Sequence, residues 1–287
     1  MKVRRLLGVF VIIAFFALGS ASAKDRAGSS TAYLALGDSI PFGYINQAGF
    51  EYFNPENFVG YPDWTGIALG LDVANAGCPG ETSGSFLSST APDNGCRLYR
   101  AHVPLHVDYG SATTQMDYAT SFLEQHGGTG LVTIQVGSND VALLEQACNN
   151  DPTCIAKGLP AVLATAAANM GTILGGLRAT GYAGPIVIAN YYSTDYSNQG
   201  ATQVTIALNQ AITSPAPLFG AVVADVFSAF QAVASQAGGK TCVAGLLNVK
   251  NGQNSFSCDV HPSQSGHKLI AQTVAQMSQS VKAKDSN

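Results

Sequence analysis

The sequence carries little charge, and it lacks a cluster of basic residues outside its first positions. Only 11% of the 287 residues are charged, the formal net charge is −4, and the basic group MKVRR stands at the N-terminus. Removing that segment makes the remaining chain more acidic. A protein that binds nucleic acid neutralises phosphates with clustered lysine and arginine side chains. The composition therefore excludes nucleic acid as an expected partner.

A long hydrophobic run is also missing, except near the N-terminus. There, MKVRR precedes the apolar LLGVFVIIAFFALGS and the small-residue ASA, which is the pattern of a secretory signal peptide. The apolar run is too short and wrongly flanked for a good transmembrane span, so a retained anchor is the less favoured alternative. We predict a signal peptide over residues 1–23, and a secreted or periplasmic protein without a stable membrane span.

Internal repeats and long Pro/Gly/Ser linkers are absent from residues 24–287. A chain of this length suits one large α/β domain or two small ones, and the absence of a linker favours one. Two segments, 45–62 and 84–118, show neither a helical nor a strand period. Long structureless segments in compact domains are usually lids or binding loops. We therefore predict a single domain over residues 24–287 with two such loops.

Six cysteines are present, and all of them follow the predicted signal peptide. In an exported chain this indicates disulfides. Short loops lose the least entropy on closing, so proximity in the sequence favours three particular bridges. The predicted pairs are Cys78 with Cys96, Cys148 with Cys154, and Cys242 with Cys258.

A metal site is not expected, although Cys258 and His261 stand close together in the sequence. No second Cys/His pair with matching spacing occurs, and free thiolates do not persist in an oxidising compartment. The cysteines are therefore interpreted as structural, and no cofactor is predicted.

Short apolar runs rich in β-branched residues alternate with stretches of helical period. Near-continuous apolar runs are typical of strands covered on both faces. The predicted strands are 33–36, 71–75, 131–136, 185–190 and 221–226. The predicted helices cover 159–177, ended by Gly181, then 204–212, and a last one from near Ser263 to 281. This alternation predicts a parallel sheet in three layers with right-handed crossovers.

Polar residues follow the first three predicted strands. In an open parallel sheet, ligands gather at the carboxyl ends of the strands. The segments are Gly37–Ser39, Asn75–Ser83 and Gly137–Asp140, with a fourth, Asp259–Pro262, outside any predicted strand. Taken singly, each segment is weak evidence for a catalytic site, because Ser39 also suits a helix N-cap and Asn139 also suits a turn. Together they supply a hydroxyl, a glycine amide, a side-chain amide and an imidazole, which are the groups needed for acyl transfer by a serine nucleophile with an oxyanion hole.

These segments resemble the four sequence blocks of the GDSL esterases and lipases, also called SGNH hydrolases, in the expected order. The blocks are Gly37-Asp38-Ser39, Asn75 to Ser83, Gly137 to Asp140, and His261-Pro262 followed by Gly266-His267. The resemblance implies a flavodoxin-like three-layer α/β/α sandwich with a central, mostly parallel five-stranded sheet. It also implies hydrolysis of carboxylic esters, with a small-molecule or lipid ester as substrate.

The resemblance assigns a role to each matching residue. Ser39 would be the nucleophile and His261 the general base. The amides of Ser39 and Gly80 and the side chain of Asn139 would form the oxyanion hole. The acid beside the nucleophile, Asp38, is interpreted as a turn former that bonds to nearby backbone.

The chain departs from the family pattern at the third member of the triad. Many members carry an aspartate three residues before the histidine, but here that position is Cys258, and the nearby acid is Asp259. Either the Asp259 carboxylate reaches Nδ1 of His261, or a backbone carbonyl of Cys258 or Asp259 orients the ring. The sequence leaves both alternatives open. His267 would lie inside the last helix and is interpreted as structural.

Three functions fit these residues. The favoured one is a secreted esterase of broad acyl specificity. The aromatic segment 45–62 and the apolar residues near Gly137, such as Val141, Leu143 and Leu144, would either line an apolar acyl site or belong to the core. The first alternative is a carbohydrate acetylesterase of the same fold, and the second is a non-catalytic binding protein. An α/β-hydrolase is excluded, because no Gly-x-Ser-x-Gly elbow occurs. The oligomeric state is not indicated.

Overall fold

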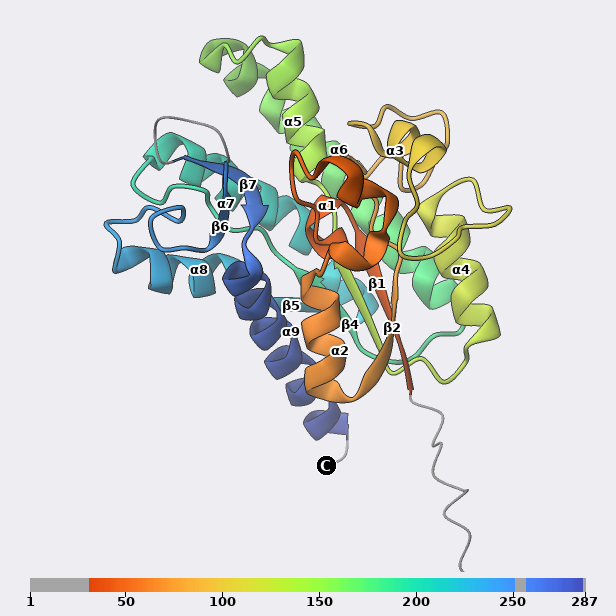
Figure 1. The fold of residues 1–287 in the computed structure, drawn as a ribbon. Coiled ribbons are helices and arrows are strands. Elements are labelled where there is room, and N and C mark those ends of the chain that lie inside the picture. Colours follow the sequence, from red (N-terminus) through yellow and green to blue (C-terminus); the bar gives the residue numbers. More distant parts are fainter. Residues whose placement is uncertain (1–30, 251–256, 286–287) are drawn as a thin grey trace, which may run out of the picture. The chain divides into compact units, whose positions relative to one another are not determined.

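The structure is a computed structural model in which residues 31–250 and 257–285 are described (Figure 1). The predicted signal peptide, residues 1–23, lies outside the described residues. In chain order the elements are β1 (Thr31–Gly37), α1 (Ser39–Phe42), the 3₁₀ turns η1 (Gly49–Phe53) and η2 (Pro55–Asn57), α2 (Tyr61–Leu69), β2 (Leu71–Asn75), α3 (Cys96–His102), α4 (Gln115–Gln125), β3 (Leu131–Gln135), α5 (Ser138–Ala147), α6 (Pro152–Ala179), β4 (Ile186–Ala189), α7 (Gln199–Thr213), η3 (Ala216–Phe219), β5 (Val222–Ala224), α8 (Val226–Ser235), β6 (Leu247–Val249), β7 (Cys258–Pro262) and α9 (Gln264–Asp285).

The central sheet has five strands in the order β2-β1-β3-β4-β5, and every neighbouring pair is parallel. This order is the flavodoxin-like one. All five predicted strands are confirmed. Every residue of β3 and β4 is buried, as expected for central strands with helices on both faces. The predicted fold class is therefore confirmed.

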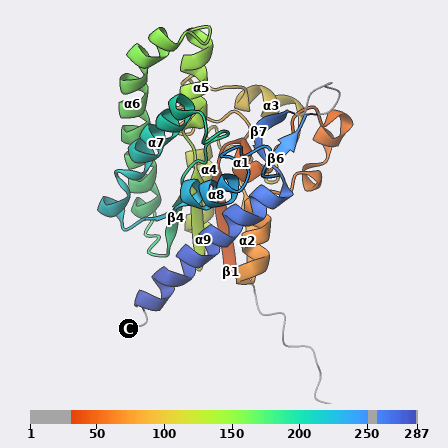
Figure 2. The same cartoon turned by 90° about the vertical axis from the view of Figure 1, so that its left-hand side faces the viewer.

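Helices cover both faces of this sheet. On one face α9 packs against α2 and α8 and contacts β4 and β5, and on the other α6 packs against α4 and α7 (Figures 1 and 2). The side chains that α6 buries are those of the predicted apolar stripe, namely Ala166, Met170, Ile173, Leu174 and Leu177. The three predicted helices are confirmed, with their ends extended by a few residues.

Among the described residues, α6 is the one helix long and apolar enough to cross a membrane by length and composition. Its second half contributes to the hydrophobic core, and core helices pass the same test. Figure 1 shows α5 and the first turns of α6 projecting beyond the sheet. The disulfide Cys148–Cys154 connects the end of α5 to the start of α6, so it fixes the tip of this projecting pair.

Two expectations about irregular segments were wrong. Residues 45–62 contain η1, η2 and the start of α2, and residues 84–118 contain α3 and the start of α4. These elements are short, and several are held by caps and aromatic contacts rather than by an apolar period. The capping box of α4, for example, pairs Thr114 with Asp117.

The placement of Asp259–Pro262 outside any strand was also wrong. These residues belong to β7, which pairs antiparallel with β6 through Leu247–Pro262 and Val249–Cys258. β6 is short, and the sequence CDVHP of β7 does not alternate apolar with polar residues. Neither strand is therefore predicted by the sequence pattern. A disulfide between Cys242 and Cys258 anchors the first residue of β7. The other bridges join Cys78 to Cys96 and Cys148 to Cys154, so the structure contains all three predicted pairs.

Candidate active site

Ser39 lies at the carboxyl end of β1, as the first residue of α1. The turn before it requires glycine at position 37, where φ is +138° and a Cβ atom would stand 2.0 Å from the carbonyl oxygen of Gln135. Asp38 caps α1, because its Oδ1 accepts a hydrogen bond of 2.9 Å from the Ile40 amide. The turn-forming role predicted for Asp38 is thus present.

Asp38 also connects three strand ends. Its Oδ2 accepts hydrogen bonds from the Tyr191 hydroxyl (2.5 Å) and the Ser138 hydroxyl (2.9 Å), which follow β4 and β3. The carboxyl group is completely buried, and burial raises its pKa, although these hydrogen bonds act in the opposite direction. Tyr191 was missed in the sequence. Tyr191 follows the fourth predicted strand, just as the three polar segments of the predicted site follow the first three strands. This position could have indicated it.

His261 reaches Ser39 from β7, more than two hundred positions along the chain. Its Nε2 lies 3.0 Å from Ser39 Oγ. The neighbouring backbone is held by Tyr192, whose hydroxyl donates a 2.6 Å hydrogen bond to the carbonyl oxygen of Val260. The Tyr44 ring packs on the imidazole with 4.9 Å between centroids. The two residues predicted as nucleophile and base are therefore in hydrogen-bonding contact.

Asp259 lies on the other side of the imidazole. Its Oδ1 is 3.3 Å from Nδ1 of His261, but the contact is not aligned as a hydrogen bond, and Nδ1 has no hydrogen-bond partner among the described residues. Instead, Oδ1 accepts a 2.7 Å hydrogen bond from the His261 backbone amide. The geometry thus brings the acid to the ring without making the triad hydrogen bond.

The loop after β2 presents Gly80 to the same site. Its φ is +88°, and a Cβ atom would stand 2.3 Å from the Asn94 carbonyl oxygen, so only glycine fits. The Asn139 side chain holds this loop, because its Nδ2 donates to the Glu81 carbonyl oxygen at 3.0 Å. An amide nitrogen carries two hydrogens, which leaves one for a ligand. The predicted oxyanion residues therefore lie beside Ser39 in one cavity.

A buried network beneath this loop was not predicted. The amide of Gln115 bonds both the backbone N–H of Gly37 (2.5 Å) and its carbonyl oxygen (2.9 Å), and its Nε2 also donates to Glu81 Oε2 at 3.1 Å. Burial raises the pKa of Glu81 to about 7. Gln115 thus ties the Gly80 loop to the turn that carries Ser39. Its position at the end of a long insertion offered no signal in the sequence.

The Ser39 cavity has a volume of about 610 Å³ and is lined by Ser39, Gly80, Asn139 and His261, whereas the fifth predicted site residue, Asp259, does not line it. Its apolar lining comes from α1, α5 and α7 and from the residues after β4, and it includes Ile40, Val141, Ala142, Val204, Leu208 and Tyr192. Of the three residues expected at an acyl site near Gly137, Val141 lines the cavity, whereas Leu143 and Leu144 do not. Leu144 packs against Gly158 of α6 instead.

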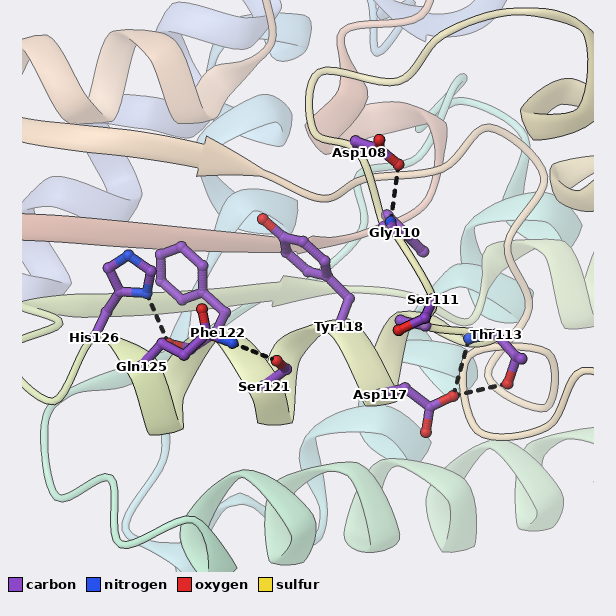
Figure 3. Close-up of a pocket in the computed structure, with 12 residues that line it drawn as sticks. Asp108, Gly110, Ser111, Thr113, Asp117, Tyr118, Ser121, Phe122, Gln125 and His126 are labelled. Carbon is purple, nitrogen blue, oxygen red and sulfur yellow. Dashed lines mark hydrogen bonds between the residues drawn. The ribbon is translucent and has the colours of Figure 1, made fainter.

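A second cavity, of about 570 Å³, lies between α4 and the loop before it (Figure 3). Figure 3 shows Tyr118, Phe122 and His126 along one side of α4, and Asp117 bonded to Thr113 near the loop. None of the predicted site residues lines it. His126 bonds to the Phe122 carbonyl oxygen, so this cavity offers no nucleophile paired with a base.

The other histidine of the fourth sequence block, His267, is buried in α9, with 1% of its surface exposed. Within the described part of the chain, neither of its ring nitrogens has a hydrogen-bond partner. Burial and the nearby His261 lower its pKa to about 3. His267 does not line the Ser39 cavity, so its place is in the core, as predicted.

His267→Met should make the fold less sensitive to acid. The unfolded chain takes up a proton near the ordinary pKa of 6.5, whereas the folded protein does so only near 3. The unfolded state therefore binds more protons in this window, and the free energy of unfolding falls by about 1.4 kcal/mol for each pH unit below 6.5. Methionine fills a similar volume and does not titrate. Urea unfolding at pH 7, 5 and 4 should show a shallower decline for the variant.

The matched control for this measurement is His126→Met, at an exposed histidine on the end of α4. It should follow the parent protein at every pH. If His267→Met and His126→Met lost stability with the same slope as the parent, the buried imidazole would not be a source of acid sensitivity.

The comparisons with known proteins agree with this fold. Residues 35–269 match the GDSL-like lipase/acylhydrolase family, and no curated protein matches the chain. Among solved structures, a phospholipase A1 from Streptomyces albidoflavus has 18% identity and a TM-score of 0.53, covering 85% of this chain and 98% of that one. An acetylxylan esterase from Geobacillus stearothermophilus has 17% identity and a TM-score of 0.52, with 86% and 93% covered. A lipase from a goat rumen metagenome has 15% identity and a TM-score of 0.51, with 86% and 97% covered.

Fold and site together define a three-layer α/β protein of flavodoxin-like topology, with a serine hydroxyl and an imidazole in one cavity at the carboxyl edge of its sheet. The family match covers most of the chain. The chain belongs to the GDSL-like lipase/acylhydrolase family and is a carboxylic ester hydrolase. The family resemblance predicted from the four sequence blocks is confirmed.

Proposed function

We propose that this protein is an exported serine esterase that hydrolyses esters of apolar acyl groups through an acyl-enzyme on Ser39. The observation that carries the proposal is the 3.0 Å distance between Ser39 Oγ and His261 Nε2. A binding protein has no need of a hydroxyl in contact with an imidazole beside two amide donors. The non-catalytic alternative is therefore disfavoured.

In the proposed reaction, Ser39 Oγ attacks the ester carbonyl carbon while its proton passes to Nε2 of His261. The carbonyl oxygen becomes an oxyanion, which accepts hydrogen bonds from the amides of Ser39 and Gly80 and from the second N–H of Asn139. The tetrahedral intermediate then expels the alkoxide, which takes the proton from His261. Water, deprotonated by the same imidazole, attacks the acyl-enzyme, and the carboxylic acid leaves as Ser39 recovers its proton.

Asp259 would hold the imidazole in the tautomer that this reaction requires. A proton on Nδ1 facing the carboxylate leaves Nε2 free to accept the proton of Ser39. The 3.3 Å contact between Nδ1 and Oδ1 supports this assignment over a backbone carbonyl. The carboxylate also stabilises the imidazolium that forms during attack.

The apolar wall of the Ser39 cavity favours an acyl chain over an acetyl group. Ile40, Val141, Val204 and Leu208 line it, and an acetyl group leaves most of such a surface uncovered. The names of the structural neighbours include both a phospholipase and an acetylxylan esterase, so the shared fold does not choose between lipid and carbohydrate esters. The apolar lining of the cavity supports lipid esters.

Export is proposed from two observations. The N-terminal sequence has the regions of a signal peptide. The six cysteines form three disulfides, which are consistent with an oxidising compartment outside the cytoplasm.

The function is tested by a hydrolysis profile over acetyl, butyryl and octanoyl esters of one alcohol. We expect kcat/KM for the octanoyl ester to exceed that for the acetyl ester by about tenfold or more, because each buried methylene contributes about 0.8 kcal/mol. Ser39→Ala should abolish activity on all three. A preference for acetyl esters would instead support the carbohydrate acetylesterase.

Val204→Phe gives a second readout of the same profile. The larger side chain enters the Ser39 cavity, so it should lower octanoyl hydrolysis and leave acetyl hydrolysis nearly unchanged. Val233→Phe is the matched control, since Val233 is 38% exposed on α8 and does not line the cavity. Equal profiles for the two variants would place the acyl chain elsewhere.

A further inference from the structure

Two phenylalanines project into solvent from the turn η1. Phe50 is 91% exposed and Phe53 is 65% exposed. Phenylalanine side chains contribute large apolar surfaces that globular proteins usually bury. Two such side chains within one short turn form an apolar projection that no described part of the chain covers. We refer to Phe50 and Phe53 as the η1 projection.

The η1 projection is linked to His261 through two tyrosine side chains. Tyr52, which lies between the two phenylalanines, donates a hydrogen bond to the Ile45 carbonyl oxygen (3.0 Å), and its hydroxyl is also 3.1 Å from the Tyr44 hydroxyl. Its ring also stacks on Tyr44, with 5.7 Å between centroids. Tyr44 in turn lines the Ser39 cavity and contacts the His261 ring. The projection is therefore linked through Tyr52 to Tyr44 in the cavity wall.

A third exposed apolar side chain lies in the wall of the cavity itself. Val260 lines the Ser39 cavity and is 60% exposed. Figure 1 shows β7, α3 and the segment between α1 and α2 at the same end of the sheet. Exposed apolar side chains thus lie on two separate segments that contact the cavity or its wall, β7 and the turn η1.

The charges near the η1 projection indicate which kind of surface it contacts. Residues 44–62 contain no lysine or arginine, and Glu51 and Glu56 are both exposed. Polybasic segments attract proteins to anionic lipids, and this segment has the opposite charge. Protein partners bury about 800 Å² on each side of a standard interface, far more than two side chains on a short turn present. An uncharged or zwitterionic lipid surface complements both the apolar tip and the missing positive charge.

We propose that Phe50 and Phe53 insert into the surface of an uncharged or zwitterionic lipid aggregate and place the Ser39 cavity against it. Aromatic and apolar side chains insert in this way at the boundary between headgroups and acyl chains. An ester group in the lipid then enters the cavity without the lipid having to cross water. The idea that lipid esters are substrates rests on the proposed function, whereas binding to the aggregate does not require catalysis.

Binding is tested with the Ser39→Ala protein, which removes turnover, on vesicles of phosphatidylcholine. Phe50→Ser/Phe53→Ser in this background should lower the vesicle partition coefficient, measured by co-sedimentation, by about tenfold or more. The matched control is Ile67→Ser/Leu218→Ser, which removes two side chains that are 74% and 83% exposed outside residues 44–62. It should bind like the parent. Vesicles containing phosphatidylserine should bind the parent less than pure phosphatidylcholine.

Equal partitioning of the Phe50→Ser/Phe53→Ser protein and its parent would overturn the proposal. So would tighter binding to the anionic vesicles. In the active protein, the double variant should retain kcat/KM on a dissolved acetyl ester within about twofold and lose activity on an ester embedded in vesicles. Equal losses on both substrates would indicate damage to the site and would also overturn it.

The two proposals fail in different ways. If the active protein hydrolysed no ester while the Ser39→Ala protein still bound vesicles through the phenylalanines, the proposed function would fail and the lipid contact would stand. If dissolved and embedded esters were hydrolysed equally well by the parent and the double variant, the lipid contact would fail and the esterase would stand.

Discussion

His261→Ala should lower kcat for ester hydrolysis by roughly 10⁴- to 10⁶-fold. Alanine removes the imidazole that lies 3.0 Å from Ser39 Oγ, and no other histidine lines the Ser39 cavity. Without a base, the hydroxyl remains protonated during attack and is a weak nucleophile. KM should change little, because the apolar wall and the oxyanion donors remain. Steady-state kinetics on a butyryl ester measure both parameters.

Fluorophosphonate labelling separates loss of the base from loss of the fold. In the parent, the reagent should attach to Ser39, as located by peptide mass spectrometry, and Ser39→Ala should prevent labelling. His261→Ala should label at a rate reduced in parallel with kcat. The control His126→Ala removes a histidine at the second cavity and should match the parent. Fast labelling of Ser39 in His261→Ala would show that another group activates the hydroxyl.

The sheet was predictable because its strands are buried on both faces. Every residue of β3 and β4 is buried, so their sequences are nearly continuous apolar runs, which can be recognised without tertiary information. The apolar stripe of α6 was predictable in the same way, because its helical period is visible in the sequence. The sheet order then follows from a small set of allowed right-handed connections and from the family resemblance.

The hairpin of β6 and β7 was not predictable in the same way. It has one short strand and one strand whose side chains alternate poorly, and its stability depends on contacts made at long range. The Cys242–Cys258 disulfide holds one end of it, and the Tyr192 hydroxyl bonds to its Val260 carbonyl oxygen. None of these contacts produces a periodic pattern of apolar residues in the local sequence. The element that delivers His261 was therefore identified by its sequence block rather than by its secondary structure.

The same distinction explains which site residues were found. Ser39, Gly80, Asn139 and His261 belong to short blocks that can be read locally, and the structure places all four in one cavity. The residues that support them act across the chain. Gln115 bonds to Gly37 over 78 positions, and Tyr191 bonds to Asp38 over 153. A supporting residue of this kind has no neighbouring partner in the sequence, so only the folded chain identifies it.

Asp38 illustrates how such support serves the site. Its two carboxylate oxygens accept from the backbone of α1 and from hydroxyls that follow β3 and β4. The turn bearing Ser39 is thereby fixed to two other strand ends. Because the group is fully buried, an apolar substitution would leave three donors without an acceptor, and each unsatisfied donor costs about 1 to 3 kcal/mol. The acid beside the nucleophile is best understood as a positioning residue.

Asp259→Asn should lower kcat by roughly 10⁴-fold while the fold stays intact. The asparagine Oδ1 still accepts the hydrogen bond that the His261 backbone amide now makes at 2.7 Å, so β7 keeps its conformation. What is lost is the negative charge 3.3 Å from Nδ1. The imidazolium that forms during attack is then no longer stabilised by a neighbouring negative charge.

The pattern of kcat and stability across variants decides between the carboxylate and a backbone carbonyl. Asp195→Asn is the control, since Asp195 is a partly exposed aspartate with a 3.9 Å ion pair to Lys240, and it should keep the parent's kcat. A melting temperature within a few degrees of the parent shows that Asp259→Asn acts on the reaction rather than on folding. Near-normal kcat in a folded Asp259→Asn protein would mean that a carbonyl of the β7 backbone orients His261, because such an acceptor is unchanged by the substitution. A large loss of kcat assigns the third position of the triad to Asp259, one residue closer to the histidine than in the usual family pattern.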